Sequence, residues 1–571
     1  MLSEMQKRLS SACAPLALAG FIFLVYLFCA TRSTLWDRDE PRYAWAGVEM
    51  LHSGNYLYPV FNGVLRPDKP ILMYWLMTVP LRWWGATELA CRFCSVLGVV
   101  AACLLTYLCG RFLFSARAGL WAMAILAATP QMVMDGTAAI ADAVLLACTT
   151  AAMTVFLHSL RSRFTVYHAL LTALALGAAL LEKAPVGAAV LLPAMAVTWW
   201  FARGQIQVGW RAILYALLAT LAAGAIFLCW AVPADRVTGG EFFRQFWGHH
   251  VAERMLRPLE GHGGNFLLTL PIYIPVVVAL FLPWTLFLPG ALSALAGARL
   301  AGPVGKWFLR GWLVPFFLIM SLAATKLPHY ILPLWPALAL AVAGTIDAHE
   351  RRLLTPRDCA WLRRGAWLAA PLVFLLAFLL IAGTKLLPAL AAGRGGSAPL
   401  EACAWVLASE KWPCAAAGAA LAVLGFVALR QHLALRIQAA ARTCFAGAIG
   451  MLLFFATFML PAVEKLKVSA PLARAIRAQT AEDVPVATCE YAEPSLIFYL
   501  NRGVIHNLAQ GSAVIAWARE PQPGVLIIPR DILPPLQRRY GDLGLREIAS
   551  ASGFNYSKGT WCDLVAVRRG P

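Results

Sequence analysis

Apolar and polar positions alternate along this chain in long blocks rather than residue by residue. Runs of roughly 17 to 25 apolar residues recur, which is the length that a helix needs to cross about 30 Å of hydrocarbon. They predict thirteen transmembrane helices, at about 12–30, 90–110, 118–134, 138–158, 166–181, 184–201, 211–230, 271–296, 307–323, 330–346, 366–386, 414–430 and 441–461. Only Glu182 and Lys183 separate the fifth and sixth spans, which predicts a tight turn or one long broken helix there.

Composition supports a polytopic membrane protein. The 571 residues are 60% hydrophobic and only 13% charged, whereas soluble chains carry about 25% charged residues. The net charge of +19 is compatible with nucleic-acid binding, but the arginines and lysines cluster in short loops between the apolar runs. That distribution is typical of cytoplasmic loops. The positive charge therefore indicates which loops lie on the cytoplasmic side of a membrane. We expect no nucleic-acid partner.

The N-terminus predicts a retained first span with its start in the cytoplasm. Lys7 and Arg8 precede the first apolar run, as in the n-region of a signal peptide. The run is about 18 residues long, and Thr31-Arg32-Ser33 follows it instead of a small-x-small cleavage site.

Three segments then fall on the outer face. The first loop, 31–89, contains amphipathic stretches at 43–52 and 71–84 that predict helices lying along the membrane surface. The second loop is 231–270. After the membrane domain, 1–465, the composition shifts, and 466–571 predicts a small α/β domain. Its strand-like runs are 484–488, 514–517, 525–528 and 564–567, and its helix-like stretches are 471–479 and 494–500.

Ionisable residues gather on the same face. Residues 35–44 hold six polar side chains, including Asp39 and Glu40, which a lipid-facing helix could not accommodate. Lys69, Asp142, Lys183 and Lys326 lie in the same loop or at span ends on this side. Each alone is equally compatible with a snorkelling lysine or a helix cap. As a set, they predict one pocket that opens to the outer face.

Such a pocket suits the transfer of a sugar from a lipid-linked phosphate. Cations must stabilise the leaving phosphate, a carboxylate must orient or deprotonate the acceptor, and the bundle must hold a polyprenyl chain. The candidate cations are Arg42, Lys69, Lys183, Arg244, Arg254 and Lys326. The candidate carboxylates are Asp39, Glu40 and Asp142, and Tyr330 adds a hydroxyl.

Fixed cations make a metal unnecessary for this chemistry. His249 and His250, with His262 nearby, could still bind a divalent metal, although adjacent loop histidines are more often ordinary polar residues. Most of the fourteen cysteines lie in apolar spans. Cys403–Cys414 and Cys489–Cys562 are possible disulfides on the outer side, where an oxidising compartment permits them.

Several motifs resemble a known family. They lie at 35–44, 67–70 with 74–75, 142, 182–183, 246–250 with 254, 282–284, 288–291, 326–333, 493–495 and 498–502. In this order and spacing they resemble the glycosyltransferases of the GT-C fold, which include the protein O-mannosyltransferases. The similarity is greatest to the lipid A aminoarabinose transferase branch. The resemblance implies a membrane domain of about thirteen helices, a periplasmic C-terminal domain and a bacterial inner-membrane location.

The same resemblance implies roles for matching residues. Asp39 is expected to be the catalytic carboxylate, and Asp142 its partner. Arg42, Lys69 and Tyr330 are expected to bind undecaprenyl phosphate, while Glu40 and Tyr43 shape the site. Three positions depart from the pattern. Asp68 and His249 stand where glutamate is usual, and Ala184-Pro185 replaces a glycine, which points to a different sugar.

The expected function is inverting transfer of a sugar from undecaprenyl phosphate to a periplasmic acceptor. Aminoarabinose and lipid A phosphate are the first choice, which implies lipopolysaccharide modification and polymyxin resistance. A protein O-mannosyltransferase-like activity, or transfer to another glycan, is the alternative. A transporter of lipid-linked sugars is a third reading, but the paired halves typical of transporters are not evident. We expect a monomer surrounded by membrane lipids.

Overall fold

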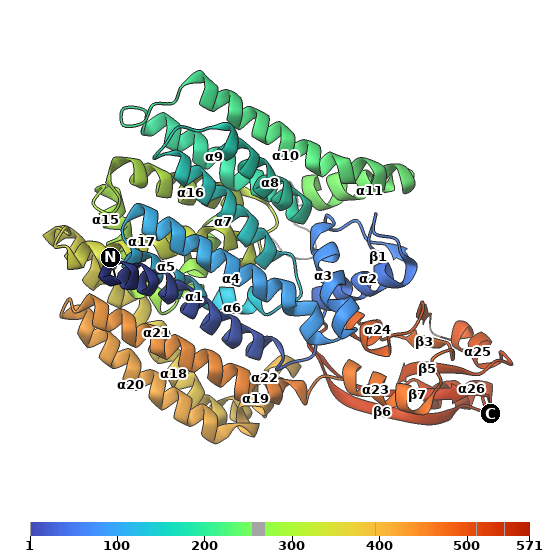
Figure 1. The fold of residues 1–571 in the computed structure, drawn as a ribbon. Helices are drawn as coiled ribbons and strands as arrows, with labels where there is room; N and C mark the ends of the chain where they lie inside the picture. The colour runs from blue at the N-terminus through green and yellow to red at the C-terminus, as the bar shows by residue number, and fades with distance from the viewer. Residues whose placement is uncertain (1, 254–268, 394–395, 510, 542, 571) are drawn as a thin grey trace.

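The computed structural model describes residues 2–253, 269–393, 396–509, 511–541 and 543–570, with side chains omitted for 2–12 and 249–252. It contains a helical body and a C-terminal sheet domain, with the first loop between them (Figure 1).

Nine helical segments in the described residues are long and apolar enough to cross a membrane. Seven of them coincide with or lie within α1 (Leu2–Ala30), α4 (Glu88–Leu113), α7 (Asp142–Ser159), α8 (Val166–Lys183), α10 (Trp210–Val237), α18 (Pro356–Ala391) and α20 (Lys411–Leu433). The other two are Pro328–Glu350, which ends in α17 (Trp335–Glu350), and Ile437–Glu464, which begins with α21 (Ile437–Phe454). Figure 1 shows α8 to α10 on one side of the body and α18, α20 and α21 on the other. The protein is therefore a multi-pass membrane protein.

Of the other four predicted spans, three form shorter or interrupted helices, and the fourth is a continuous helix of 21 residues. They are α5 (Ala116–Ala127) with α6 (Pro130–Gly136), α9 (Val186–Phe201), α14 (Tyr273–Leu280) with α15 (Leu288–Ala296), and α16 (Gly302–Leu322). Proline accounts for the interruptions, because it lacks an N–H and clashes with the preceding turn. Pro130 begins α6, Pro185 precedes α9, and Pro283 lies between α14 and α15. The break at 184–185 produces two helices, α8 and α9, rather than one.

The first loop folds as predicted into two helices. These are α2 (Asp39–Ser53) and α3 (Leu72–Trp84), with the short hairpin β1 (Val60–Phe61) and β2 (Val64–Leu65) between them. Gly54 ends α2 in the left-handed conformation, φ 69°, which a residue without Cβ adopts at little cost. Trp45 of α2 and Met77 of α3 share one apolar core with Leu496 and Ile527 of the C-terminal domain.

The C-terminal domain is an α/β unit. Its sheet has the strand order β4-β3-β5-β7-β6, with β3 parallel to β4 and β5, and β7 antiparallel to β5 and β6. The strands are β3 (Val486–Cys489), β4 (His506–Leu508), β5 (Gly524–Pro529), β6 (Arg546–Asn555) and β7 (Thr560–Arg569). The helices are α23 (Ser469–Gln479), α24 (Pro494–Leu500), α25 (Ser512–Ala518) and α26 (Leu533–Tyr540).

One predicted strand and both predicted disulfides are wrong. Residues 514–517 lie in helix α25, where Val514 and Trp517, three positions apart, are both buried. All fourteen cysteines, each within the described residues, are free. Cys414 is buried while Cys403 is exposed. Cys489 packs into the cluster on one face of the sheet and Cys562 against the core on the other.

Candidate active site

The centre of the candidate site is a buried ion pair at two helix ends. Asp142 begins α7 and Lys183 ends α8, and Lys183 Nζ lies 2.7 Å from Asp142 Oδ1. Their side chains are only 10% and 14% exposed. Each charge suits its helix terminus, since an acidic group is stabilised at an N-terminus and a basic group at a C-terminus.

A short helical segment, η4 (Pro328–Leu334), adds aromatic groups to this pair. Lys183 Nζ lies 5.1 Å from the centre of the Tyr330 ring, a cation–π distance. His329 is within electrostatic range of Asp142 and Lys183, and also of Asp39 and Lys69. Lys183 therefore joins Asp142 to Tyr330 of η4, and the charges of Asp39 and Lys69 act on His329 of the same segment.

Asp39 and Glu40 are adjacent but differ in environment. Asp39 is the first residue of α2 and is exposed. Glu40 is 3% exposed and forms a two-pronged ion pair with Arg92 of α4, with Oε1 at 2.8 Å from Nε and Oε2 at 2.7 Å from Nη2. It also accepts hydrogen bonds from the backbone N–H of Trp36 and Ala139. We propose that Glu40 positions the first loop and that Asp39 acts on substrate.

Arg92 completes this junction by donating to the backbone oxygens of Ala30, Ser33 and Thr34. We expect Arg92→Met to lower the unfolding free energy by about 3–5 kcal/mol, because Glu40 is then buried without its cation. Thermal unfolding in detergent would measure the loss. Arg111→Met, at an exposed position of the same helix, is the matched control and should change little. An equal melting temperature for the two variants would contradict the assignment.

A second cluster lies beside Lys69. Arg66 is buried, donates to the Tyr74 hydroxyl at 3.1 Å and pairs with Asp68 at 3.4 Å. Its guanidinium lies 5.2 Å from the Tyr43 ring, which stacks on Tyr74. Burial raises the pKa of Tyr74 to about 12, against the lowering effect of Arg66, so its hydroxyl stays protonated at neutral pH.

The sequence did not single out Arg66 or Arg92. Arg66 immediately precedes the 67–70 motif, and that position was the available signal. Arg92 lies within an apolar span, where an unexplained charge indicates a buried partner.

Other predicted residues are placed differently. Lys326 donates to the backbone oxygens of Ser321 and Ala323, so it caps the end of α16. Arg42 is half-buried on α2. Exposed Arg244 pairs with Glu241. His249 and His250 lie in η1 (Arg244–Glu253), whose side chains at those positions are not described, and Arg254 and His262 lie outside the described residues. Across the described chain, no three His, Cys, Asp or Glu side chains are grouped to hold a metal.

Comparisons with known proteins show what this chain is similar to. The family model of dolichyl-phosphate-mannose-protein mannosyltransferases matches residues 14–237. The undecaprenyl phosphate-alpha-4-amino-4-deoxy-L-arabinose arabinosyl transferase 2 of Proteus mirabilis is 30% identical over 338 residues, and the corresponding transferase of Edwardsiella ictaluri is 31% identical over 337. Each match covers 58% of this chain and 59% of the relative, so the chain spans about three-fifths of these curated relatives.

The solved structures decide the fold. The crystal structure of ArnT from Cupriavidus metallidurans bound to undecaprenyl phosphate superposes with a TM-score of 0.73 at 20% identity, covering 97% of this chain and 99% of that one. An oligosaccharyltransferase from Archaeoglobus fulgidus gives a TM-score of 0.52 at 12% identity, covering 96% and 74%. The chain has the GT-C fold. The resemblance noted in the sequence is confirmed.

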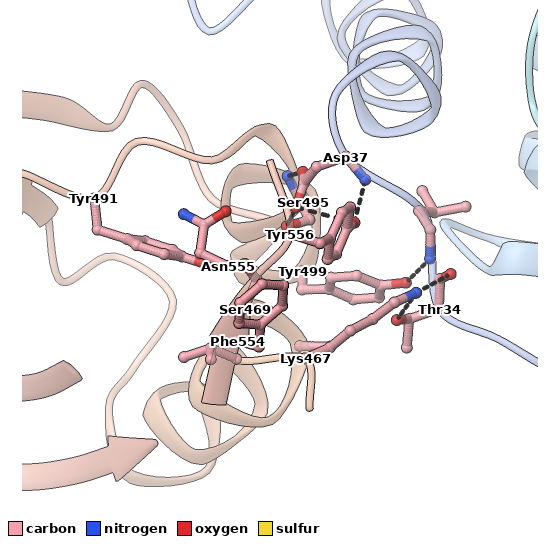
Figure 2. A pocket seen from close by; sticks show the side chains of 13 residues that line it. Thr34, Asp37, Lys467, Ser469, Tyr491, Ser495, Tyr499, Phe554, Asn555 and Tyr556 are labelled. Atoms are coloured by element: carbon pink, nitrogen blue, oxygen red, sulfur yellow. Dashed lines mark hydrogen bonds between the residues drawn. The ribbon is translucent and has the colours of Figure 1, made fainter. Parts of the chain in front are cut away.

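In this GT-C chain the C-terminal domain is bonded directly to the first loop. Figure 2 shows Asp37 facing Ser495 of α24 and Tyr556. Asp37 accepts 2.6 Å hydrogen bonds from the Ser495 N–H and hydroxyl, and its own N–H donates to the Tyr556 hydroxyl. Lys467 donates to Thr34 at 3.0 Å. The remaining cavity is about 10 Å³, room for about one water.

Burial raises the pKa of Asp37 to about 6, with Ser495 lowering it, Glu493 raising it and Lys467 lowering it. The folded state therefore binds more protons than the unfolded state between about pH 4 and 6. We expect stability to fall as pH rises through this interval and then to level off. Asp37→Asn should remove this contribution. Thermal unfolding of both proteins from pH 4 to 7 would test it, and identical pH profiles would contradict it.

Proposed function

We propose that this chain is an inverting glycosyltransferase that moves a sugar from undecaprenyl phosphate to an acceptor at the periplasmic face of the bacterial inner membrane. The observation that carries the proposal is the gathering of Asp39, Lys69, Asp142 and Lys183 near His329 and Tyr330 of η4. The GT-C fold supports it. The names of the curated relatives support aminoarabinose as the sugar.

In this proposal the cations act on the leaving group. When the bond between the anomeric carbon and the phosphate oxygen breaks, negative charge grows on the phosphate, and preoriented cations stabilise it. Lys69 and Arg42 have this role, with Tyr330 as a hydrogen-bond donor. Lys183 is bonded to Asp142 at 2.7 Å, so it holds that carboxylate in place while contributing positive charge to the site.

The carboxylate Asp39 acts on the acceptor side. The acceptor oxygen attacks the anomeric carbon on the face opposite the phosphate, which inverts the configuration. A lipid A phosphate is already a nucleophile, so Asp39 would take no proton from it and would instead balance the positive charge that develops on the sugar in the transition state. A hydroxyl acceptor would require Asp39 as general base. The exposure of Asp39, in contrast to buried Glu40, supports this assignment.

The names of the relatives support aminoarabinose as the sugar, whereas lipid A as the acceptor rests on the resemblance seen in the sequence. Aminoarabinose transfer to lipid A is the primary proposal. The match of residues 14–237 to the mannosyltransferase model favours a second candidate, the transfer of another polyprenyl-linked sugar to a glycan or protein. For this second candidate, we assign the altered sugar preference to Asp68 and His249, where the sequence departs from the family pattern.

Mass spectrometry of lipid A would test the proposal. We expect cells with the intact gene to carry one aminopentose on a lipid A phosphate, and cells that lack the gene or carry Asp39→Asn to lack it. Unmodified lipid A in all three strains would contradict aminoarabinose transfer to lipid A. The second candidate would then be tested by glycan profiling of the same strains.

A further inference from the structure

The proposed mechanism gives no role to His329, although this histidine lies at the centre of the candidate site. It is half-buried in η4, and its ring meets the Tyr330 ring edge-on, with 5.0 Å between the ring centres. Four charged side chains act on it: Asp39, Lys69, Asp142 and Lys183. A polar group in this place is surrounded by the residues to which the chemistry is assigned.

Two neighbouring helices fix the backbone just before His329. Gln131 of α6 donates to the Pro328 oxygen at 3.0 Å, and Tyr273 of α14 donates to the Leu327 oxygen at 3.2 Å. The segment that carries the imidazole is therefore held from two sides. A hydrogen-bonding group that is held in place before the reaction costs no reorganisation when charge develops near it.

The imidazole has unused hydrogen-bonding capacity. The charges around it balance, since two are carboxylates and two are ammonium groups. A neutral imidazole offers one N–H donor and one acceptor nitrogen. Within the part of the chain that the structure describes, neither ring nitrogen of His329 forms a hydrogen bond. The ring is also partly exposed, so a substrate atom can reach it.

The charges that act on His329 belong to both sides of the proposed reaction. Lys69 acts on the leaving phosphate, and Asp39 acts on the acceptor side. The reacting sugar lies between these two groups, and the charges of both act on the imidazole. The leaving phosphate oxygen is the atom that gains negative charge, and a fixed N–H donor stabilises a growing negative charge most effectively.

We propose that His329 is a further catalytic residue, whose imidazole N–H donates a hydrogen bond to the phosphate oxygen that leaves the sugar. The inference rests on the proposed function. The acceptor oxygen forms the new bond to the anomeric carbon, and the electron pair of the broken bond stays on the phosphate oxygen. No proton is transferred to or from the imidazole. The hydrogen bond strengthens as the oxygen gains charge, so it acts on the transition state more than on the bound donor.

Two substitutions separate the N–H group from the ring. His329→Phe keeps a ring beside Tyr330 and removes the N–H, whereas His329→Gln keeps an N–H donor. We expect kcat to fall about 10²-fold in His329→Phe, as when one such donor is removed, with the KM for the donor lipid within threefold. His329→Gln should recover at least tenfold of this loss. If the phenylalanine impairs folding, His329→Ala removes the N–H without adding bulk.

The matched control is His349→Phe, at a half-buried histidine in the last turn of α17. It should keep wild-type kinetics, and all variants should melt within a few degrees of wild type. A purely structural role for His329 would instead lower the melting temperature and leave kcat unchanged for the folded fraction. Wild-type kcat in His329→Phe, or equal losses in His329→Phe and His329→Gln, would overturn the inference.

Binding of undecaprenyl phosphate gives a second measurement, which needs no turnover. This product carries the negative charge that the hydrogen bond is proposed to stabilise. Its Kd, from titration of the purified chain in detergent, should rise tenfold or more in His329→Phe and less in His329→Gln. If wild-type chain transfers no sugar, the proposed function fails, and this titration alone decides. Weaker binding in His329→Phe then supports the contact with the phosphate, and unchanged binding overturns it.

Discussion

Asp39→Asn is expected to reduce the rate of sugar transfer by about 10²–10⁴-fold, the range associated with a positioned acid or base. The substitution keeps the shape of the side chain and removes its charge. Asp39 is exposed at the first residue of α2, so the loss of stability should be limited to about 0.3–1 kcal/mol of helix-dipole interaction. Turnover of purified enzyme with saturating donor and acceptor would measure the effect.

The control for this prediction is Asp483→Asn, an exposed aspartate of the C-terminal domain. Both variants should melt within a few degrees of wild type, but only Asp39→Asn should lose transfer. Turnover near the wild-type rate in Asp39→Asn would remove the residue from the chemistry. In that case Asp142, the other carboxylate of the cluster, would become the candidate.

Lys69→Ala is expected to lower kcat/KM for the donor by about 10²–10³-fold, as seen when one preoriented group that stabilises a developing anion is removed. Lys69 is half-buried and acts electrostatically on both Asp142 and His329. The positive charge of Lys69 therefore influences the residues at the centre of the site. Steady-state kinetics at varied donor concentration would measure the loss, together with binding of undecaprenyl phosphate.

Two further variants sharpen this experiment. Lys69→Arg keeps the charge but not its geometry and should recover part of the activity. Lys385→Ala removes an exposed lysine from α18 and should have no effect. Donor kinetics and affinity that are unchanged in Lys69→Ala would exclude Lys69 from the phosphate-binding group.

Much of the fold could be predicted because apolar run length and helical periodicity depend on local sequence. The long spans and the two first-loop helices follow directly from these signals. Interruptions were harder to predict, because a proline in an apolar run breaks a helix only where neighbouring segments satisfy the freed backbone groups. The stretch 514–517 illustrates the ambiguity of short apolar runs, which suit a buried strand and a buried helix equally.

For the candidate site, too, the sequence predicted one part and could not predict another. Motifs located Tyr330 of η4 together with Asp39, Lys69, Asp142 and Lys183, whose charges act on that segment. Motifs could not give the partner of each side chain, since that depends on contacts between distant segments. Glu40 and Lys326 were predicted to act on substrate. The Glu40 carboxylate instead pairs with Arg92, and the Lys326 ammonium group caps the end of α16. Their roles in catalysis stay untested predictions.

The bonds from Asp37 to Ser495 join positions 458 residues apart and lie two residues from Asp39. Residues 34–40 and the C-terminal domain therefore form a matched set, although they are far apart in the sequence. A chimera that took its C-terminal domain from a relative would need the donor's version of 34–40 as well. A change at Ser495 or Tyr556 would act on Asp39 through the first loop, so we expect variants with altered transfer activity to include changes in the C-terminal domain.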